Sequence, residues 1–139
     1  MSKIERIGVS LEKELLSVFD RLVAEDGYTT RSEAIRALIR ERLSRKRLSD
    51  ASAQAVAGVF LVYDHHETKL PQNLVDLQHS HLLQVIASTH VHLDHDNCME
   101  VIMLRGKVKD IEKLASNIAS LKGVKLSRMN AMAIGEDLI

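Results

Sequence analysis

The sequence of 139 residues has little of what marks secreted, membrane or single-strand-binding proteins. Its one cysteine, Cys98, excludes a disulfide bond within the chain. No apolar run approaches the roughly 18 residues of a membrane-spanning helix, and the N-terminus has no apolar signal core. Two tyrosines, two phenylalanines and no tryptophan leave few aromatic side chains on which single-stranded bases stack. We therefore expect a cytoplasmic protein outside these classes.

The composition is that of a folded protein, with 45% hydrophobic and 27% charged residues. The formal net charge is zero, but the two signs are unevenly distributed. Residues 1–47 hold eleven basic and eight acidic side chains, a net charge of +3, and the remainder carries −3. A mildly basic N-terminal part permits contact with a polyanion without requiring it.

The N-terminal part is typical of one strand followed by two helices. Residues 5–11 alternate between polar and apolar side chains, which predicts a strand. One face of this strand carries Ile7, Val9 and Leu11, and the other carries Arg6, Gly8 and Ser10. Apolar residues at helical spacing over 11–23 predict a helix that stops at Gly27. Thr30 and Glu33 then fit a capping box, and the second helix ends in the basic stretch "RERLSRKR".

A single strand in so short a unit has no partner, and under about 50 residues a unit rarely folds alone. A symmetric dimer solves both problems by pairing two such strands into an antiparallel ribbon. A two-stranded ribbon fits the major groove of DNA. Arg6 would bond guanine, Gly8 would allow close approach, and Ser10 would contact a base or phosphate. The alternative is a dimerisation unit whose Arg6 is merely solvated.

The second part alternates strand and helix patterns after a small, polar stretch. The expected elements are strand 56–65, helix 70–81, strand 84–93, strand 98–105, helix 108–121 and strand 123–133. This order, βαββαβ, is that of a ferredoxin-like unit. We therefore predict an α+β protein with a β-α-α ribbon-helix-helix domain over residues 1–48, a linker over 49–55 and a ferredoxin-like domain over 56–139.

The stretch "THVHLDHDNCME" holds three histidines and the cysteine. His90 and His92 share one face of the predicted strand because side chains alternate with period 2. If "LDHDN" is a five-residue hairpin loop, His92 lies opposite Cys98 and His90 opposite Glu100. Two imidazoles and a thiolate suit nickel, copper or zinc rather than magnesium or calcium. The alternative is a surface pair of histidines and a buried cysteine that only packs.

Other histidines offer a fourth ligand. His79 and His81 lie two residues apart near a helix end, so they point to nearly opposite sides and at most one joins a given site. The ligand would come from across a subunit interface, because both faces of the predicted sheet are apolar and one needs another subunit to cover it. Glu100 is either an acceptor for a ligand imidazole or an edge carboxylate. We expect His65, His66 and His95 at the surface, with a weak secondary site at the first two as the alternative.

The motifs "RSEAIR", "QHSH" and "HVHLDHDNCMEV" resemble those of the nickel-responsive transcriptional regulators over nearly the whole chain. The resemblance implies a homotetramer that binds double-stranded operator DNA through Arg6, Gly8 and Ser10. It also implies one Ni(II) per chain in square-planar coordination by His90, His92 and Cys98, with His79 of a neighbouring chain. Members of the family typically repress nickel-uptake genes when nickel is plentiful.

Three alternatives to a nickel-dependent repressor follow from the residues. The same architecture could respond to copper or cobalt, which the sequence does not separate. A metal-storage protein would keep the metal site but ignore DNA. An enzyme is the least expected, because no orienting group or oxyanion donor accompanies Cys98 as a nucleophile.

Overall fold

The computed structural model describes residues 3–67 and 69–135. Two compact units, Met1–Glu41 and Arg42–Ile139, divide the chain within its second helix. The predicted domain boundaries at residues 48 and 56 stay a prediction, and the outer ends of those domains, residues 1–2 and 136–139, lie outside the described residues. None of the described helices is both long enough and apolar enough to cross a membrane.

Two helices follow the N-terminal segment, as predicted: α1 (Lys13–Glu25) and α2 (Arg31–Leu48). The capping box before α2 is present, since the Glu33 backbone N–H donates to Thr30 Oγ1 at 3.2 Å. The Glu33 carboxylate reaches one residue further back than predicted and accepts the Thr29 N–H at 3.1 Å. This exchange satisfies two donors that the start of a helix would otherwise leave unpaired.

The predicted strand over residues 5–11 is absent from the single chain, where residues 3–12 have no regular secondary structure. The apolar side chains of Ile7 and Val9 are 80% and 64% exposed. A strand is defined by hydrogen bonds to a neighbouring strand, and the first unit contains none to pair with. The two faces of the alternating pattern, and the partner strand, stay a prediction.

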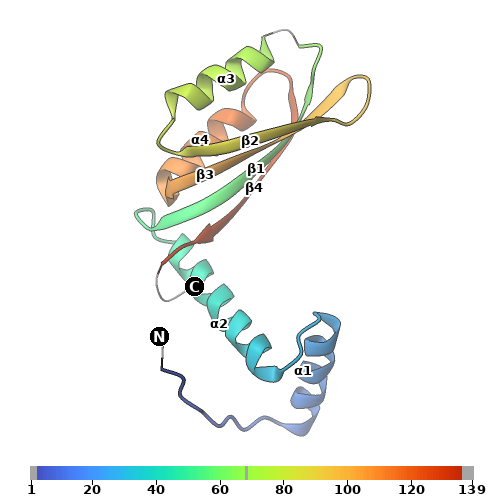
Figure 1. Cartoon of the computed structure of the whole chain (residues 1–139), viewed down its shortest axis with the longest axis vertical. Helices are drawn as coiled ribbons and strands as arrows, with labels where there is room; N and C mark the ends of the chain where they lie inside the picture. Colours follow the sequence, from blue (N-terminus) through green and yellow to red (C-terminus); the bar gives the residue numbers. More distant parts are fainter. Residues whose placement is uncertain (1–2, 68, 136–139) are drawn as a thin grey trace. The chain divides into compact units, whose positions relative to one another are not determined.

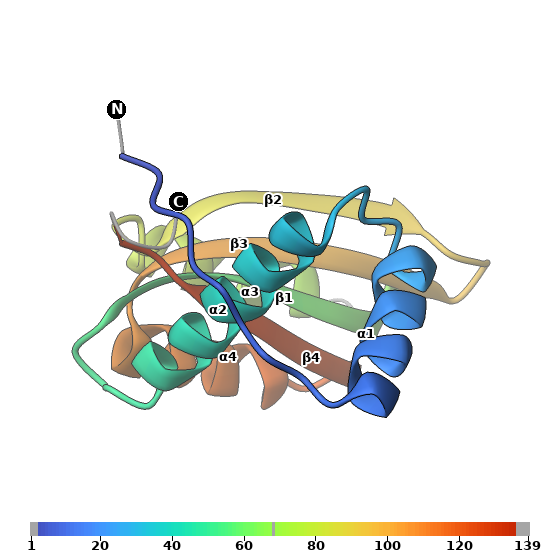
Figure 2. The ribbon, with the colours of Figure 1, turned by 90° about the horizontal axis from the view of Figure 1, so that it is seen from below.

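The second unit is a four-stranded antiparallel sheet with the strand order β2-β3-β1-β4 (Figures 1 and 2). Its elements are β1 (Gln54–Asp64), α3 (Leu70–Ser80), β2 (Val85–His92), β3 (Asn97–Lys107), α4 (Val108–Ala119) and β4 (Val124–Ala133). The order βαββαβ confirms the predicted fold class. The two middle strands, β1 and β3, are the first and third strands along the chain and run antiparallel.

One face of this sheet is covered by α3 and α4 and forms the core (Figure 1). Alternate residues of β1 point into it, which is the burial pattern of a strand covered on one side. The apolar stripe of α4 is buried: Val108, Ile111, Leu114, Ala115 and Ile118. From α3, Leu70 and Leu74 reach the same core. The core between these helices and the sheet supports the end of β1 and the start of β3, where the candidate site lies.

The opposite face of the sheet is apolar and uncovered in the single chain. It carries alternate residues of the strands with large exposed side chains: Phe60, Val91, Met103, Leu126 and Met132. An apolar face of this extent is typical of a protein interface. Its exposure supports the expectation that a second copy covers it.

Gly123 connects α4 to β4 and holds the loop after β1 in place. Its φ is +98°, and a Cβ there would lie 2.9 Å from Leu70 Cδ2 and 3.0 Å from Glu67 Cγ. We expect Gly123→Ala to lower the free energy of unfolding by about 2 to 3 kcal/mol, from backbone strain plus overpacking. Gly27→Ala is the matched control, because Gly27 also has a positive φ, +79°, but no atom within 4 Å of the added Cβ.

Urea denaturation of both variants would measure the difference. Gly27→Ala should cost only about 1 kcal/mol, the strain of a left-handed backbone. Equal losses in the two variants would show that Leu70 and Glu67 move aside, and that Gly123 is required for its backbone alone.

Candidate metal centre

The hairpin of β2 and β3 has the register that the sequence predicted. His92 pairs with Cys98 and His90 with Glu100, with five and nine residues between the partners. On the other face Val91 pairs with Met99 and Thr89 with Val101. The side chains of His90, His92, Cys98 and Glu100 therefore belong to the helix-covered face of the sheet.

Asp94 holds the tip of this hairpin. Its Oδ1 accepts the backbone N–H groups of Asp96 and Asn97, both at 2.8 Å, and the Asn97 side-chain amide at 3.1 Å. The Asn97 side chain and these backbone donors stabilise the carboxylate, which lowers the pKa of Asp94. A loop fixed in this way sets the register by which Cys98 faces His92.

The other end of β2 departs from simple alternation. A bulge between Val85 and Ala87 shifts the pairing, so that Val85 lies opposite Leu104. Ile86, which simple alternation places on the ligand-bearing face, is 59% exposed, and Val85 packs against the core instead. The bulge lies on the far side of His90 from the hairpin loop and leaves the pairing of His90 and His92 unchanged.

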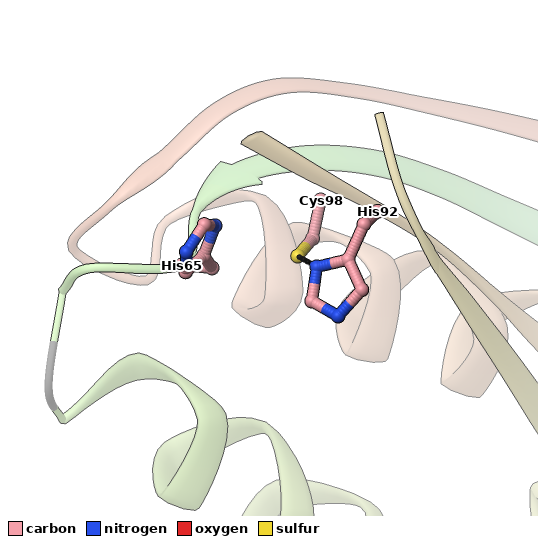
Figure 3. A group of neighbouring side chains, drawn as sticks. All are labelled: His65, His92 and Cys98. Atoms are coloured by element: carbon pink, nitrogen blue, oxygen red, sulfur yellow. Dashed lines mark hydrogen bonds between the residues drawn. The ribbon is translucent and has the colours of Figure 1, made fainter. Parts of the chain in front are cut away.

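Cys98 and His92 are in direct contact: Cys98 Sγ lies 3.2 Å from His92 Nδ1 (Figure 3). Two donors bound to one metal at roughly 2.0–2.3 Å stand about 3.1 to 3.6 Å apart, so side chains at the observed separation can bind one ion. Burial, together with the negative charges of Asp94 and Glu100, raises the pKa of the Cys98 thiol. The thiol is therefore protonated at neutral pH and releases its proton when it becomes a ligand.

His65 is the third member of this group, and it is partly buried where the sequence predicted a surface position or a weak secondary site. It follows the end of β1, and its backbone N–H donates to the Asp96 carbonyl at 3.0 Å. One donor atom each from His65, His92 and Cys98 lies within 4.8 Å of the others. Figure 3 shows the His65 ring beside Cys98. His65 Nδ1 is buried without a hydrogen-bond partner, which is costly for a polar atom and would be relieved by a bound ion.

A pocket of about 370 Å³ opens beside these side chains. Its lining includes His90, whose ring centre is 5.3 Å from that of His92, although His90 is not within the close group of three. Tyr63 and Glu100 also line the pocket. Burial and the neighbouring charges of Glu100 and Cys98 raise the pKa of Tyr63 to about 12, so its hydroxyl is a neutral hydrogen-bond donor.

Glu100 is 8% exposed and lies across the strands from His90. Burial raises the pKa of its carboxyl group, while hydrogen bonds from Gln78 and Ser88 and the proximity of His90 oppose that shift. A carboxylate so placed is suited to hold the His90 ring in one orientation, the role predicted as the first alternative for this residue.

The structure does not bring His79 to the pocket. His79 is exposed on α3 and is not among the pocket's lining residues. His81 Nδ1 bonds the Leu77 carbonyl at 2.8 Å at the end of the same helix, which occupies that nitrogen. Within one chain the described residues therefore supply His92, Cys98, His65 and the nearby His90, and His79 is free to face another chain.

The residues predicted to contact DNA lie in the N-terminal segment. Arg6, Gly8 and Ser10 are all exposed in the single chain. A Cβ added at Gly8 would meet no atom within 4 Å, so nothing within the chain requires glycine there.

Comparison with known proteins decides between a general metal-binding domain and a specific family. Residues 56–132 match the family described as the NikR C terminal nickel binding domain, and residues 5–46 match the family described as ribbon-helix-helix protein, copG family. The chain belongs to the nickel-responsive regulator family. The first match spans more than half of the chain and contains every metal-ligand candidate.

Relatives of this family match the chain from end to end. Proteins named "Putative nickel-responsive regulator" from Solibacter usitatus and Pyrococcus furiosus are 44% and 43% identical to it, covering 99% and 98% of this chain and 99% of each relative. One of the same name from Chlorobium phaeobacteroides is 49% identical over 90% of this chain and 92% of its own length. Family membership therefore applies to both parts of the chain.

Proposed function

We propose that this chain is a nickel-responsive transcription regulator that represses genes of nickel uptake in the cytoplasm when Ni(II) is bound. The observation that carries the proposal is the contact between His92 and Cys98 in a pocket of the domain that matches the nickel-binding family. The ribbon-helix-helix match supports double-stranded DNA as the partner. A protein of this family acts by binding, so no catalytic residue is assigned.

Each chain would hold one nickel ion through His90, His92 and Cys98, with His79 contributed by a neighbouring chain. Two imidazoles and a thiolate are the nitrogen and sulfur donors that Ni(II) prefers in a square plane. When bound, the ion supplies a crosslink between donors that come from different strands and different chains. Glu100 would hold the His90 ring, and His65, with its unpaired Nδ1, would compete with His79 for the fourth position.

The DNA-binding part would act as a dimer. Residues 5–11 of two chains would pair into a ribbon, which explains why Ile7 and Val9 are exposed in one chain. Arg6, Gly8 and Ser10 would then read the operator from the polar face. The second domain, predicted over residues 56–139, would join two dimers into a tetramer through its uncovered sheet face. Nickel would favour the tetramer shape whose ribbons reach both half-sites.

Selection of DNA from a random pool by the nickel-loaded full-length protein would test this function. The selected sequence should then be bound in a mobility shift with nickel and released when nickel is chelated. The same assay with Cu(II) or Co(II) alone would identify a regulator of another metal. Tight nickel binding without any selected sequence would indicate a storage protein.

Arg6→Ala should weaken binding to the selected operator by about 1 to 3 kcal/mol, the usual size of a lost bidentate base contact. Nickel affinity should stay unchanged, because Arg6 lies outside the residues matched by the nickel-binding family. Mobility shifts at several salt concentrations would measure both the loss and its salt dependence.

Lys113→Ala is the matched control, since Lys113 is an exposed basic residue on α4 and its loss removes the same charge. Operator binding by Arg6→Ala equal to that of Lys113→Ala would show that another element reads the DNA.

A further inference from the structure

A second group of metal donors lies outside the pocket. Among the described residues, His66, His95 and Asp96 each offer a donor atom, and these three atoms lie within 4.8 Å of one another. His66 Nε2 is 3.2 Å and His95 Nδ1 is 3.1 Å from the same oxygen, Asp96 Oδ1. All three residues are exposed, in contrast to buried Cys98. None of them belongs to the proposed nickel ligand set.

The backbone brings these donors together from two distant loops. His66 follows β1, whereas His95 and Asp96 lie at the tip of the β2–β3 hairpin. The two loops are joined where His65 N–H donates to the Asp96 carbonyl at 3.0 Å. Each loop is also fixed internally, since Asp64 Oδ1 accepts the His66 N–H at 2.9 Å and Asp94 Oδ1 accepts the Asp96 N–H at 2.8 Å. The group is therefore held by its loops before any ligand arrives.

We propose that His66, His95 and Asp96 form a second binding site for a divalent transition metal. Two imidazoles and one carboxylate are the donors of many Zn(II) sites, and zinc accepts water in its remaining positions. The carboxylates of Asp64 and Asp94, each bonded to a backbone N–H of this group, add negative charge nearby. The ion displaces the two hydrogen bonds that now join the imidazoles to Asp96.

This site should bind more weakly than the pocket. Its three side chains are exposed to water, and it has a carboxylate where the pocket has a thiolate. It is also close to the pocket, because the ring centres of His65 and His66 are 4.1 Å apart. The proposal does not depend on nickel being the pocket's metal, since its donors are separate and its probe is zinc.

Zinc binding to the full-length protein tests the proposal. Equilibrium dialysis against zinc chloride should show one more zinc per chain in the wild type than in His95→Gln or Asp96→Asn. In these variants zinc affinity at this site should fall at least about tenfold. Loss of a residue that only hydrogen-bonds a metal ligand already lowers metal affinity by at least about that factor. Correlation spectra of ¹⁵N-labelled histidine rings should show His66 and His95 shifting in the same zinc titration.

Asp76→Asn is the matched control. Asp76 is likewise an exposed carboxylate that accepts a side-chain hydrogen bond, from Gln72 at 2.7 Å, and its loss removes the same charge. Its zinc binding should equal that of the wild type. The proposal is overturned if all three variants bind equal zinc, if Asp76→Asn loses as much as Asp96→Asn, or if the His66 and His95 rings stay unshifted at saturating zinc.

Discussion

Nickel-dependent DNA binding should be lost when Cys98 is replaced by serine. Cys98 supplies the only thiol of the chain, and a thiolate favours the square-planar form of Ni(II) over six-coordinate alternatives. Serine keeps the shape but is a poor ligand at neutral pH. The Cys98–His92 pair, 3.2 Å apart, would thereby lose one of its two donors. A nickel titration with a mobility shift on the selected operator measures the loss.

Zinc binding should distinguish the loss of a nickel ligand from general damage to the pocket. Because zinc binds well to nitrogen and oxygen donors in a tetrahedron, Cys98→Ser should weaken zinc binding less than nickel binding. The absorbance from thiolate-to-nickel charge transfer should also disappear. Nickel-dependent operator binding at the wild-type level in the serine variant would contradict the assignment and leave Cys98 as a packing residue.

The fold of that variant needs its own control. Cys98 is 1% exposed and belongs to the hydrophobic core. A buried hydroxyl without a partner costs about 1 to 3 kcal/mol. Cys98→Ala removes the donor without burying a polar group, so both variants should lose the nickel response whatever their difference in stability. Circular dichroism of the metal-free proteins would verify that both are folded.

The pairing of His92 with Cys98 could be predicted from the sequence because two simple constraints act on it. Side chains alternate along a strand, and a five-residue loop leaves only one pairing of the flanking residues. The helix stripe of α4 was equally predictable, since five apolar residues at helical spacing had to face one layer. In both cases the signal is local and periodic.

His65 could not be found by the same reasoning, because its neighbours are distant in the sequence. It depends on the strand order, which places β1 antiparallel beside β3 and pairs Tyr63 with Cys98. The end of β1 therefore meets the start of β3, where the donors lie. The predicted βαββαβ order already contained this adjacency, so the topology, rather than the motif, was the signal that could have identified His65.

The two other departures have different causes. Ile86 lies at a bulge, and a single inserted residue reverses the face of every side chain beyond it. Residues 5–11 have the pattern of a strand but no partner within the chain. A pattern predicts which faces a segment has, whereas its hydrogen-bonding partner depends on the assembly.

Mixed oligomers should show which histidine completes the nickel site. In His79→Ala every chain keeps His90, His92 and Cys98 but lacks the proposed neighbour's ligand. In the double variant His90→Ala/His92→Ala each chain can still donate His79. If His79 acts across chains, neither parent should retain nickel through dialysis, whereas mixing them equally should restore complete sites in about a quarter of the chains, by random pairing of neighbours.

His65 provides the competing outcome. Its Nδ1 is buried and unpaired within reach of Cys98 and His92, so it offers a fourth donor from the same chain. If His65 fills that position, His79→Ala should retain nickel by itself, and His65→Ala should lose it. Because the double variant lacks two ligands of its own chain, mixing would then add nothing beyond the His79→Ala sites.

Subunit exchange has to be verified before the mixture is interpreted, for instance by mass spectrometry of oligomers built from chains of different mass. Charge-transfer absorbance after dialysis then reports complete sites only, because it requires the Cys98 thiolate on nickel. Its appearance in the mixture, and in neither parent, would establish His79 as a ligand from the neighbouring chain. If full exchange does not restore this absorbance, and His65→Ala binds nickel like the wild type, neither His79 nor His65 is the fourth ligand. The fourth position would then belong to another donor. The contact between His92 and Cys98 would remain in either case, since it depends only on the hairpin register.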